Sequence, residues 1–316
     1  MDRSTTAQPD SKLLTIFLAL TAAVGLAACS SLSAQSDTSP KNQGVVLQVV
    51  AAENFWGSIA GQIGGTHVHV VSIITNPNTD PHAYEPTSMD AQLVAGAKMV
   101  IENGIGYDPW VPTLLSADQS HPKVLDVGTV VGVADGGNPH RWYNPQDVQQ
   151  VERQLVSDYK TLDPANASYF SAQALKFNTV SLRPYDEAIA SIRAKYSGTP
   201  VGASESIFAM LAPALGLDLI TPPTFLRAIS EGTDVTTGDK ETIDSQIKDH
   251  LIKIYVYNSQ NVTPDVQAQL TEVKAEHIPF ATITETLVPA SSTYQAWQTR
   301  QLAGIEAALA KAVPAK

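Results

Sequence analysis

The sequence contains little cysteine, few charged side chains and an excess of acidic over basic residues. Only one of its 316 residues is cysteine, which excludes an internal disulfide and a zinc site built from several cysteines. Charged residues make up 16% and hydrophobic residues 43%, a balance that excludes a disordered tail protein or a coiled coil and indicates a globular protein. The net charge of −11 would repel phosphates, so we expect no nucleic acid as a partner.

Sequence motifs of several enzyme classes are also missing. The chain contains no H-E-x-x-H motif and no Walker A sequence, which excludes an ATPase role. Gly104-x-Gly106 follows a predicted strand, but Pro109 stands at the third glycine position, so a dinucleotide loop is not supported. Residues 202–206 follow a strand and open a helix as a nucleophile elbow does. That pattern ends in Gly and tolerates Ser206 there poorly.

The start of the chain is typical of an export signal. An apolar run from Leu13 to Leu26 follows a polar start that contains Arg3 and Lys12. The run is too short and too rich in Ala and Gly for a comfortable membrane span, which favours a signal peptide over residues 1–28. We find no later run long enough to span a bilayer.

The apolar run ends in L-A-A-C, which resembles the bacterial lipobox. In that resemblance the chain is cut before Cys29 and a diacylglycerol is attached to this residue. The alternative is a plain signal peptide with a chance cysteine, but the single cysteine stands at the expected place. Residues 29–44 are expected to form a lipidated flexible tether, rich in Ser, Gln, Asp and Thr. We therefore expect an extracytoplasmic protein, anchored by lipid to the bacterial cell membrane.

From Val45 onward, short apolar runs alternate with longer amphipathic ones, which predicts parallel sheets covered by helices. The first set of expected strands is 45–50, 68–74, 99–101 and 124–127. Its expected helices are 55–63, 89–96 with Ser88 as N-cap, and 110–115. In the second set, the expected strands are 200–203, 252–257 and 280–283. The expected helices are 207–215, 240–250, 264–276 and 294–312.

Residues 145–196, between the two sets, have only helical character. Asp163 is the predicted N-cap of one long helix that reaches Tyr196 and is interrupted or kinked near Pro184. At about 1.5 Å per residue, this helix is long enough to join two lobes, although two ordinary helices in a single domain are the alternative. We predict an α/β fold of two lobes, each a parallel sheet covered by helices, joined by a long helical spine. The predicted parts are a signal peptide (1–28), a tether (29–44), an N-terminal lobe (45–162), a linking helix (163–197) and a C-terminal lobe (198–316).

Side chains able to bind a metal follow four of the predicted strands. Ligands of open α/β sheets bind beyond the carboxyl ends of the strands, and His82, His140, Glu205 and Glu285 stand there, two in each predicted lobe. Each is a weak signal alone, because a His beside Pro is often a surface residue and a Glu at a helix start is usually a cap or a favourable charge. Together they indicate two imidazoles and two carboxylates that can converge in one cleft.

Two of these segments carry a resemblance to a known family. D-P-H-x-Y-E-P-T at residues 80–87 and N-P-H-x-W at residues 138–142 are the two histidine signatures of the solute-binding lipoproteins of bacterial ABC importers for zinc and manganese. N-G-I-G at residues 103–106 before Trp110, and S-E at residues 204–205 at a helix start, agree as well. The chain resembles this family from about Val45 to its C-terminus.

The resemblance implies a metal site of four ligands. Carried over by residue, His82 and His140 are ligands from the first lobe. Glu205 matches the third ligand, which is Glu in manganese-type members and usually His in zinc-type members. Glu285 falls where many members carry Asp. The implied cargo is one divalent transition metal, zinc or manganese, and the implied fold has the helical spine and closes only slightly on binding.

The other histidines give weaker signals. The chain lacks the long His-rich loop that zinc-type members often carry between the two signatures, where His121 is the only His. His67 and His69 lie two residues apart in a predicted strand and therefore face one side. They fit either a metal pair or, more simply, an exposed strand face.

We therefore predict a binding protein and not an enzyme. It would capture Zn²⁺ or Mn²⁺ outside the cytoplasm as a monomer and deliver the ion to an ABC permease, whose ATPase is another chain. Four protein ligands leave little room for an activated water, which favours binding over hydrolysis. The alternatives are a metal-dependent hydrolase that uses the same His and Glu residues with Glu85 or Asp80 as base, and a surface adhesin.

Overall fold

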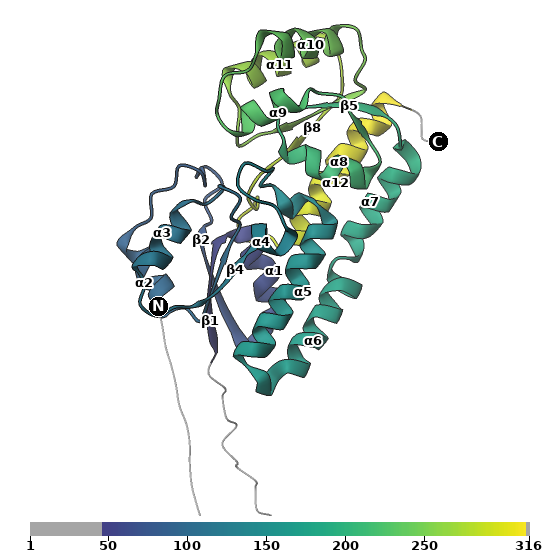
Figure 1. Cartoon of the computed structure of the whole chain (residues 1–316). Coiled ribbons are helices and arrows are strands. Elements are labelled where there is room, and N and C mark those ends of the chain that lie inside the picture. Colours follow the sequence, from purple (N-terminus) through teal and green to yellow (C-terminus); the bar gives the residue numbers. More distant parts are fainter. Residues whose placement is uncertain (1–45, 314–316) are drawn as a thin grey trace, which may run out of the picture. The chain divides into compact units, whose positions relative to one another are not determined.

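The computed structural model of the protein describes residues 46–313, so the predicted signal peptide, Cys29 and the tether lie outside the described residues. All described residues belong to one compact unit, residues 43–316. It contains two four-stranded parallel sheets covered by helices (Figure 1), which confirms the predicted fold class. Within residues 46–313 we find no helix both long and apolar enough to cross a membrane.

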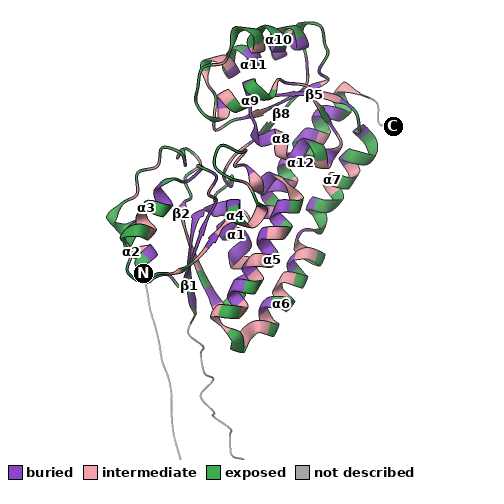
Figure 2. Cartoon of the chain, in the orientation of Figure 1, coloured by how far each residue is buried: buried purple, intermediate pink, exposed green. Residues whose placement is uncertain are grey.

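The first sheet and its helices form what we call the first lobe. Its strand order is β2-β1-β3-β4. The strands are β1 (Leu47–Glu53), β2 (Val68–Ile74), β3 (Met99–Glu102) and β4 (Lys123–Asp126). The helices are α1 (Asn54–Gly64), α2 (Ser88–Gly96), α3 (Trp110–Ala117) and α4 (Val127–Val131). Strands β1 and β3 are buried almost throughout because both faces of the sheet are covered, and they read as continuous apolar runs (Figure 2).

The second sheet and its helices form the second lobe. Its strand order is β6-β5-β7-β8. The strands are β5 (Pro200–Ala203), β6 (Asp218–Leu219), β7 (Ile254–Asn258) and β8 (Phe280–Ile283). The helices are α8 (Ile207–Leu215), α9 (Pro223–Ser230), α10 (Thr237–Lys248), α11 (Pro264–Ala275) and α12 (Tyr294–Ala312). Because β7 pairs in parallel with β5 and β8, the carboxyl ends of these three strands lie at one edge.

The segment between the sheets is helical, as predicted, but it is not one helix. It contains α5 (Pro145–Leu162), α6 (Ala167–Lys176) and α7 (Arg183–Tyr196). A π-helical turn over Phe177–Ser181 separates α6 from α7, and there the Leu182 N–H donates to the carbonyl of Phe177, five residues earlier. Pro184 lies in the first turn of α7 and explains the break, because proline lacks an N–H and its ring clashes with the carbonyl four residues earlier.

One predicted helix cap stands where expected, and the other is displaced by one residue. Asp163 is the N-cap of a 3-10 turn over Pro164–Asn166 that precedes α6, but its carboxylate accepts a hydrogen bond from the Asn166 side-chain amide (2.7 Å) instead of from a helix N–H. Helix α2 is capped by Thr87 and not by Ser88. Thr87 Oγ1 accepts from the Asp90 N–H, and the Asp90 carboxylate accepts from the Thr87 N–H, so each residue satisfies a free donor of the other.

One hydrophobic core runs through both lobes. It includes Val49 of the first sheet and Ile254 of the second. Helix α12 contributes to the connection, since it packs along α7 and β8 while the Tyr294 hydroxyl at its start donates to the carbonyl of Trp142 in the first lobe (2.6 Å). The predicted lobe boundaries at residues 162 and 197 stay predictions.

Candidate metal centre

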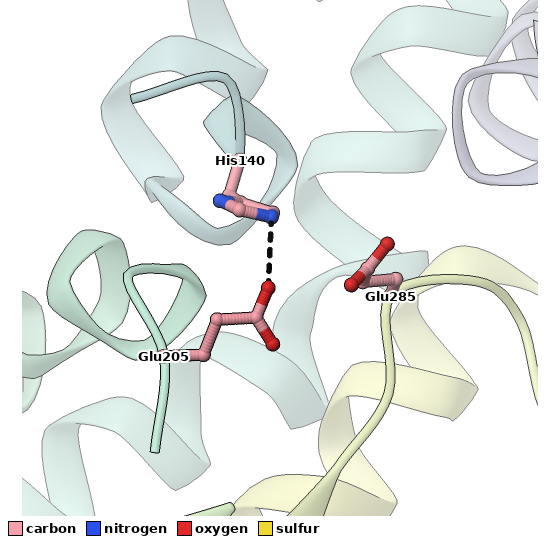
Figure 3. A group of neighbouring side chains, drawn as sticks. All are labelled: His140, Glu205 and Glu285. Atoms are coloured by element: carbon pink, nitrogen blue, oxygen red, sulfur yellow. Dashed lines mark ion pairs between the residues drawn. The ribbon is translucent and has the colours of Figure 1, made fainter. Parts of the chain in front are cut away.

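Three of the four predicted site residues lie together. One ligand atom from each of His140, Glu205 and Glu285 lies within 4.8 Å of the others (Figure 3). His140 stands in the loop after α4, Glu205 follows β5 and Glu285 follows β8. The parallel pairing of the second sheet brings the two carboxylates to one edge, and the first lobe supplies the imidazole.

The fourth predicted residue, His82, lies beside this group and not within it. Its side chain is exposed, and its Nδ1 lies 3.3 Å from the carbonyl oxygen of Gly106. Its ring packs edge-on against Tyr107, with 4.8 Å between the centroids, and the Tyr107 ring in turn lies 6.0 Å from that of His140. His82 is thus one aromatic ring away from the group, and its role as a ligand stays a prediction.

The orientation of His140 is set by Asn138. The Asn138 side-chain amide donates to the carbonyl of Ser206 (2.7 Å), so its oxygen faces the histidine, and this oxygen lies 2.9 Å from His140 Nδ1. An amide oxygen accepts only, and Nδ1 therefore carries the proton. The lone pair of His140 is on Nε2, which points at Glu205 Oε1 across 3.7 Å.

His140 stays uncharged over the physiological pH range. Its side chain is 1% exposed, and burial, followed by the nearby charge of His82, lowers the pKa of His140 from its ordinary value to about 3. A neutral imidazole with its free nitrogen facing two carboxylates is the form that binds a metal ion.

The two carboxylates, that of buried Glu205 and that of half-buried Glu285, share one hydrogen-bond donor. Asn258 Nδ2 lies 2.7 Å from Glu205 Oε2 and 2.7 Å from Glu285 Oε1. Ser230 Oγ donates to the second oxygen of Glu205 (3.2 Å), and the Tyr107 hydroxyl donates to the second oxygen of Glu285 (3.1 Å). These three donors come from three different segments of the chain, so the carboxylates are held in place before any cation arrives.

The pair of carboxylates is short of positive charge. Burial raises the pKa of Glu205, and burial together with the charge of Glu205 raises the pKa of Glu285 to about 8. Neither lysine nor arginine forms an ion pair with Glu205 or Glu285 among the ion pairs of the described residues, and His140, 3.7 Å from Glu205, is uncharged. A divalent cation between the three side chains would relieve this repulsion.

Sequence analysis missed the residues that hold the ligands. Asn258 ends β7, the strand between β5 and β8, so the strand-end rule that pointed to Glu205 and Glu285 applies to it as well. Asn138 belongs to the N-P-H-x-W signature, and the Asn103–Gly106 segment precedes Tyr107, but neither pattern indicates a hydrogen bond to a ligand.

The other candidate residues lie outside the group. His67 ends a 3-10 turn and not a strand, and its ring packs on Tyr169 with 4.5 Å between the centroids. His69 is exposed on β2, so the two histidines do not share a strand face as predicted. Asp80 accepts a hydrogen bond from the His82 N–H (2.9 Å), and Glu85 is exposed. In the part of the chain that the structure describes, the search for three or more converging metal-binding side chains gives only the group described above.

A cavity of about 650 Å³ opens beside the group. Both lobes line it, and its walls include His82 and Gly106 from the first lobe and Ser230 and Glu285 from the second. The cavity gives a cation access from solvent to the carboxylate of Glu285.

Residues 49–308 match the family described as "ZnuA: Zinc-uptake complex component A periplasmic". The chain belongs to this family. It is 27% identical to the manganese-binding lipoprotein MntA of Halalkalibacterium halodurans over 143 residues. This alignment covers 44% of this chain and 47% of that protein. It is 24% identical over 256 residues to the metal ABC transporter substrate-binding lipoprotein ScbA of Streptococcus cristatus, covering 74% and 77%. The alignment with MntA thus spans about half of that relative.

Solved structures agree with the fold. A periplasmic metal binding protein from Candidatus Liberibacter asiaticus has a TM-score of 0.69 at 18% identity, over 83% of this chain and 98% of that one. The solute-binding protein FpvC from P. aeruginosa, in complex with Ni²⁺, has a TM-score of 0.67 at 20% identity, over 84% and 98%. At these identities the likeness concerns the fold, and with the family match it confirms the predicted resemblance.

Proposed function

We propose that this protein is the extracytoplasmic solute-binding component of an ABC importer. It captures one divalent transition metal ion, Zn²⁺ or Mn²⁺, between its two lobes and delivers the ion to a membrane permease with a separate ATPase. The observation that carries the proposal is the convergence of His140, Glu205 and Glu285 within 4.8 Å, with the lone pair of the imidazole directed at the carboxylates. The relatives named as manganese-binding and metal ABC transporter lipoproteins support it.

The donor set selects the class of ion. Imidazole nitrogen and carboxylate oxygen suit Zn²⁺ and Mn²⁺, and the described residues place no thiolate in the group, which soft Cu⁺ would prefer. Two carboxylates balance the charge of a divalent ion. His82 lies close enough to Tyr107 and the group to serve as the predicted fourth ligand after a movement of its loop.

We propose binding and not catalysis. The hydrolase alternative needs a general base beside the metal, but Asp80 is engaged by a backbone N–H and Glu85 is exposed. Membership of a family of substrate-binding proteins favours metal capture over both the hydrolase and the adhesin alternatives.

Lipid anchoring at Cys29 is part of the proposal. The L-A-A-C segment supports it, as does the word lipoprotein in the names of several relatives. In cells given a radioactive fatty acid, the full-length protein should carry label and sediment with membranes. Cys29→Ala should lose the label, and a variant that keeps it would contradict the assignment.

Metal analysis tests the proposed function. The protein is purified without chelator, and its metal content is measured by plasma mass spectrometry. We expect about one equivalent of Zn²⁺ or Mn²⁺ per chain, and competition between the two ions should favour Zn²⁺, following the Irving–Williams order. A protein that retains neither ion, and takes up neither on titration, would contradict the proposal.

A further inference from the structure

A fully buried amide lies between the two carboxylates of the site. Asn258 is the last residue of β7 and is 0% exposed. Its Nδ2 carries two N–H bonds, and it lies 2.7 Å from one oxygen of Glu205 and 2.7 Å from one oxygen of Glu285. The two N–H bonds of a single amide thus serve both carboxylates.

The amide has no freedom to turn away. Asn258 Oδ1 accepts a hydrogen bond from the Gln260 N–H (2.9 Å), which identifies the other end of the amide as the NH₂ group. The Asn258 backbone N–H donates to Ser204 Oγ (3.1 Å), beside Glu205. Rotation by 180° would place the oxygen against two carboxylates and lose three hydrogen bonds.

The hydrogen bonds of Asn258 divide the oxygens of each carboxylate into two kinds. Glu205 Oε2 and Glu285 Oε1 are occupied by the amide. The remaining oxygen of Glu205 faces His140 Nε2, at 3.7 Å, and accepts only a longer hydrogen bond from Ser230 Oγ (3.2 Å) among the described side-chain hydrogen bonds. The remaining oxygen of Glu285 accepts only from the Tyr107 hydroxyl among the described hydrogen bonds, which leaves it a lone pair.

We propose that Asn258 is a positioning residue that makes both carboxylates monodentate and thereby favours zinc over manganese. This proposal rests on the proposed function of the site. Zn²⁺ is satisfied by four nitrogen and oxygen ligands in a tetrahedron. Mn²⁺ suits octahedral sites rich in oxygen, and a carboxylate that binds through both oxygens helps to fill such a site. An amide that holds one oxygen of each carboxylate withholds these extra ligands.

The amide also acts on the charge of the two carboxylates. Burial raises the pKa of both carboxyl groups, and the hydrogen bonds from Asn258 act in the opposite direction. An N–H donor between two carboxylates reduces their repulsion without adding a positive charge that a cation would have to displace. A lysine at this position would satisfy the carboxylates but would repel the metal ion.

The decisive variant is Asn258→Ala, which frees one oxygen of each carboxylate. Affinities for Zn²⁺ and Mn²⁺ are measured by competition with a chromophoric chelator. We expect the ratio of Zn²⁺ to Mn²⁺ affinity to fall roughly tenfold, the lower end of what an outer hydrogen bond contributes at metal sites. X-ray absorption of the Zn²⁺ complex should show more oxygen neighbours than in the wild type. An unchanged ratio with an unchanged spectrum would overturn the proposal.

Two further variants serve as an intermediate case and as a control. Asn258→Ser keeps one hydroxyl donor, so its affinity ratio should lie between wild type and Asn258→Ala, and it decides the question if the alanine variant does not fold. Gln246→Leu is the control, because Gln246 is a buried amide that donates to the carbonyl of Ile220 away from the site, and its ratio should match wild type. Wild-type protein that binds neither ion would contradict the proposed function, whereas metal binding with equal ratios in all variants would contradict only the role of Asn258.

Discussion

Asn138 fixes the tautomer of His140 through a hydrogen bond of 2.9 Å between Asn138 Oδ1 and His140 Nδ1. The same asparagine donates to the carbonyl of Ser206 in the second lobe, so the orientation of the imidazole depends on how the lobes meet. The free nitrogen of His140 therefore faces Glu205 only when both hydrogen bonds are made. Two residues of the N-P-H-x-W signature act together, one as the predicted ligand and one as its support.

Replacing Asn138 should weaken metal binding without removing a ligand. In Asn138→Leu, His140 loses the acceptor that keeps the proton on Nδ1, and the ring can turn or change tautomer. We expect the affinity for Zn²⁺ to fall by roughly 10- to 100-fold, measured by competition with a chelator. Asn138→Asp restores an acceptor for the imidazole N–H and should recover part of the loss. Equal affinities of Asn138→Leu and wild type would show that the tautomer is set by something else.

Removing the imidazole itself should cost more. His140→Ala deletes one of the three converging ligands, so its affinity should fall further than that of Asn138→Leu, by more than roughly 100-fold. His67→Ala is the matched control, because His67 packs on Tyr169 away from the site and should leave the affinity unchanged. His82→Ala reports on the predicted fourth ligand, and an affinity equal to wild type would remove His82 from the ligand set.

The pH dependence of metal binding should follow a carboxyl group and not His140. The pKa of His140 is lowered to about 3, so this residue is already neutral at pH 5, whereas the pKa of Glu285 is raised to about 8. Below pH 8 the metal has to displace the proton of Glu285, so affinity should rise with pH between about 6 and 8 and then level off. Calorimetric titrations in two buffers of different ionisation enthalpy measure the protons released. Binding at pH 6.5 without proton release would contradict this assignment.

A second group of buried carboxyls should make the stability of the fold depend on pH. Glu102 ends β3 and is 8% exposed; burial, followed by the charges of Asp108 and Asp126, raises its pKa to about 8. The native state therefore keeps a proton that the unfolded state loses above about pH 4.3, so the free energy of unfolding falls as pH rises through this window and changes little above pH 8. Glu102→Gln should be more stable than wild type at pH 8 by roughly 2 kcal/mol, with little difference at pH 4.

Urea denaturation of the metal-free protein at several pH values checks this prediction. Glu187→Gln serves as the control, because Glu187 is an exposed residue of α7 that, among the described residues, forms an ion pair only with Arg183 on the same helix. Its stability should follow wild type across the pH range. A Glu102→Gln variant that follows wild type equally closely would show that Glu102 ionises in the native protein as it does in water.

The convergence of Glu205 and Glu285 in the candidate metal centre was predictable because the ends of the strands can be recognised in the sequence. Apolar runs over β5 and β8 end directly before Ser204 and Thr284, and parallel strands must bring the following residues to the same edge. His140 was also predicted from its place after the expected strand 124–127, but that signal is weaker, since in the structure its loop follows α4 and not a strand directly.

The hydrogen bonds that organise the site were not predictable in the same way. Asn258 and Glu285 are 27 residues apart in the chain, and Tyr107 and Glu285 are 178 residues apart. The strand-end rule brings Asn258 and Glu285 to one edge of the second sheet but does not indicate their hydrogen bond, and the pair of Tyr107 and Glu285 depends on how the two lobes face each other. The predicted long helix is interrupted near Pro184, as expected from that residue, but the sequence did not indicate that the interruption is a π-helical turn over Phe177–Ser181.

The most direct test of the account is a calorimetric titration of wild-type protein and of the Glu205→Gln, Glu285→Gln double variant with Zn²⁺. Both substitutions keep the shape of the side chain and remove its charge, and they relieve the repulsion that raises the pKa of Glu285, so the metal-free variant should fold. We predict one tight equivalent for wild type and loss of that equivalent in the double variant. Tight binding of one Zn²⁺ by the double variant, as in wild type, would contradict the account.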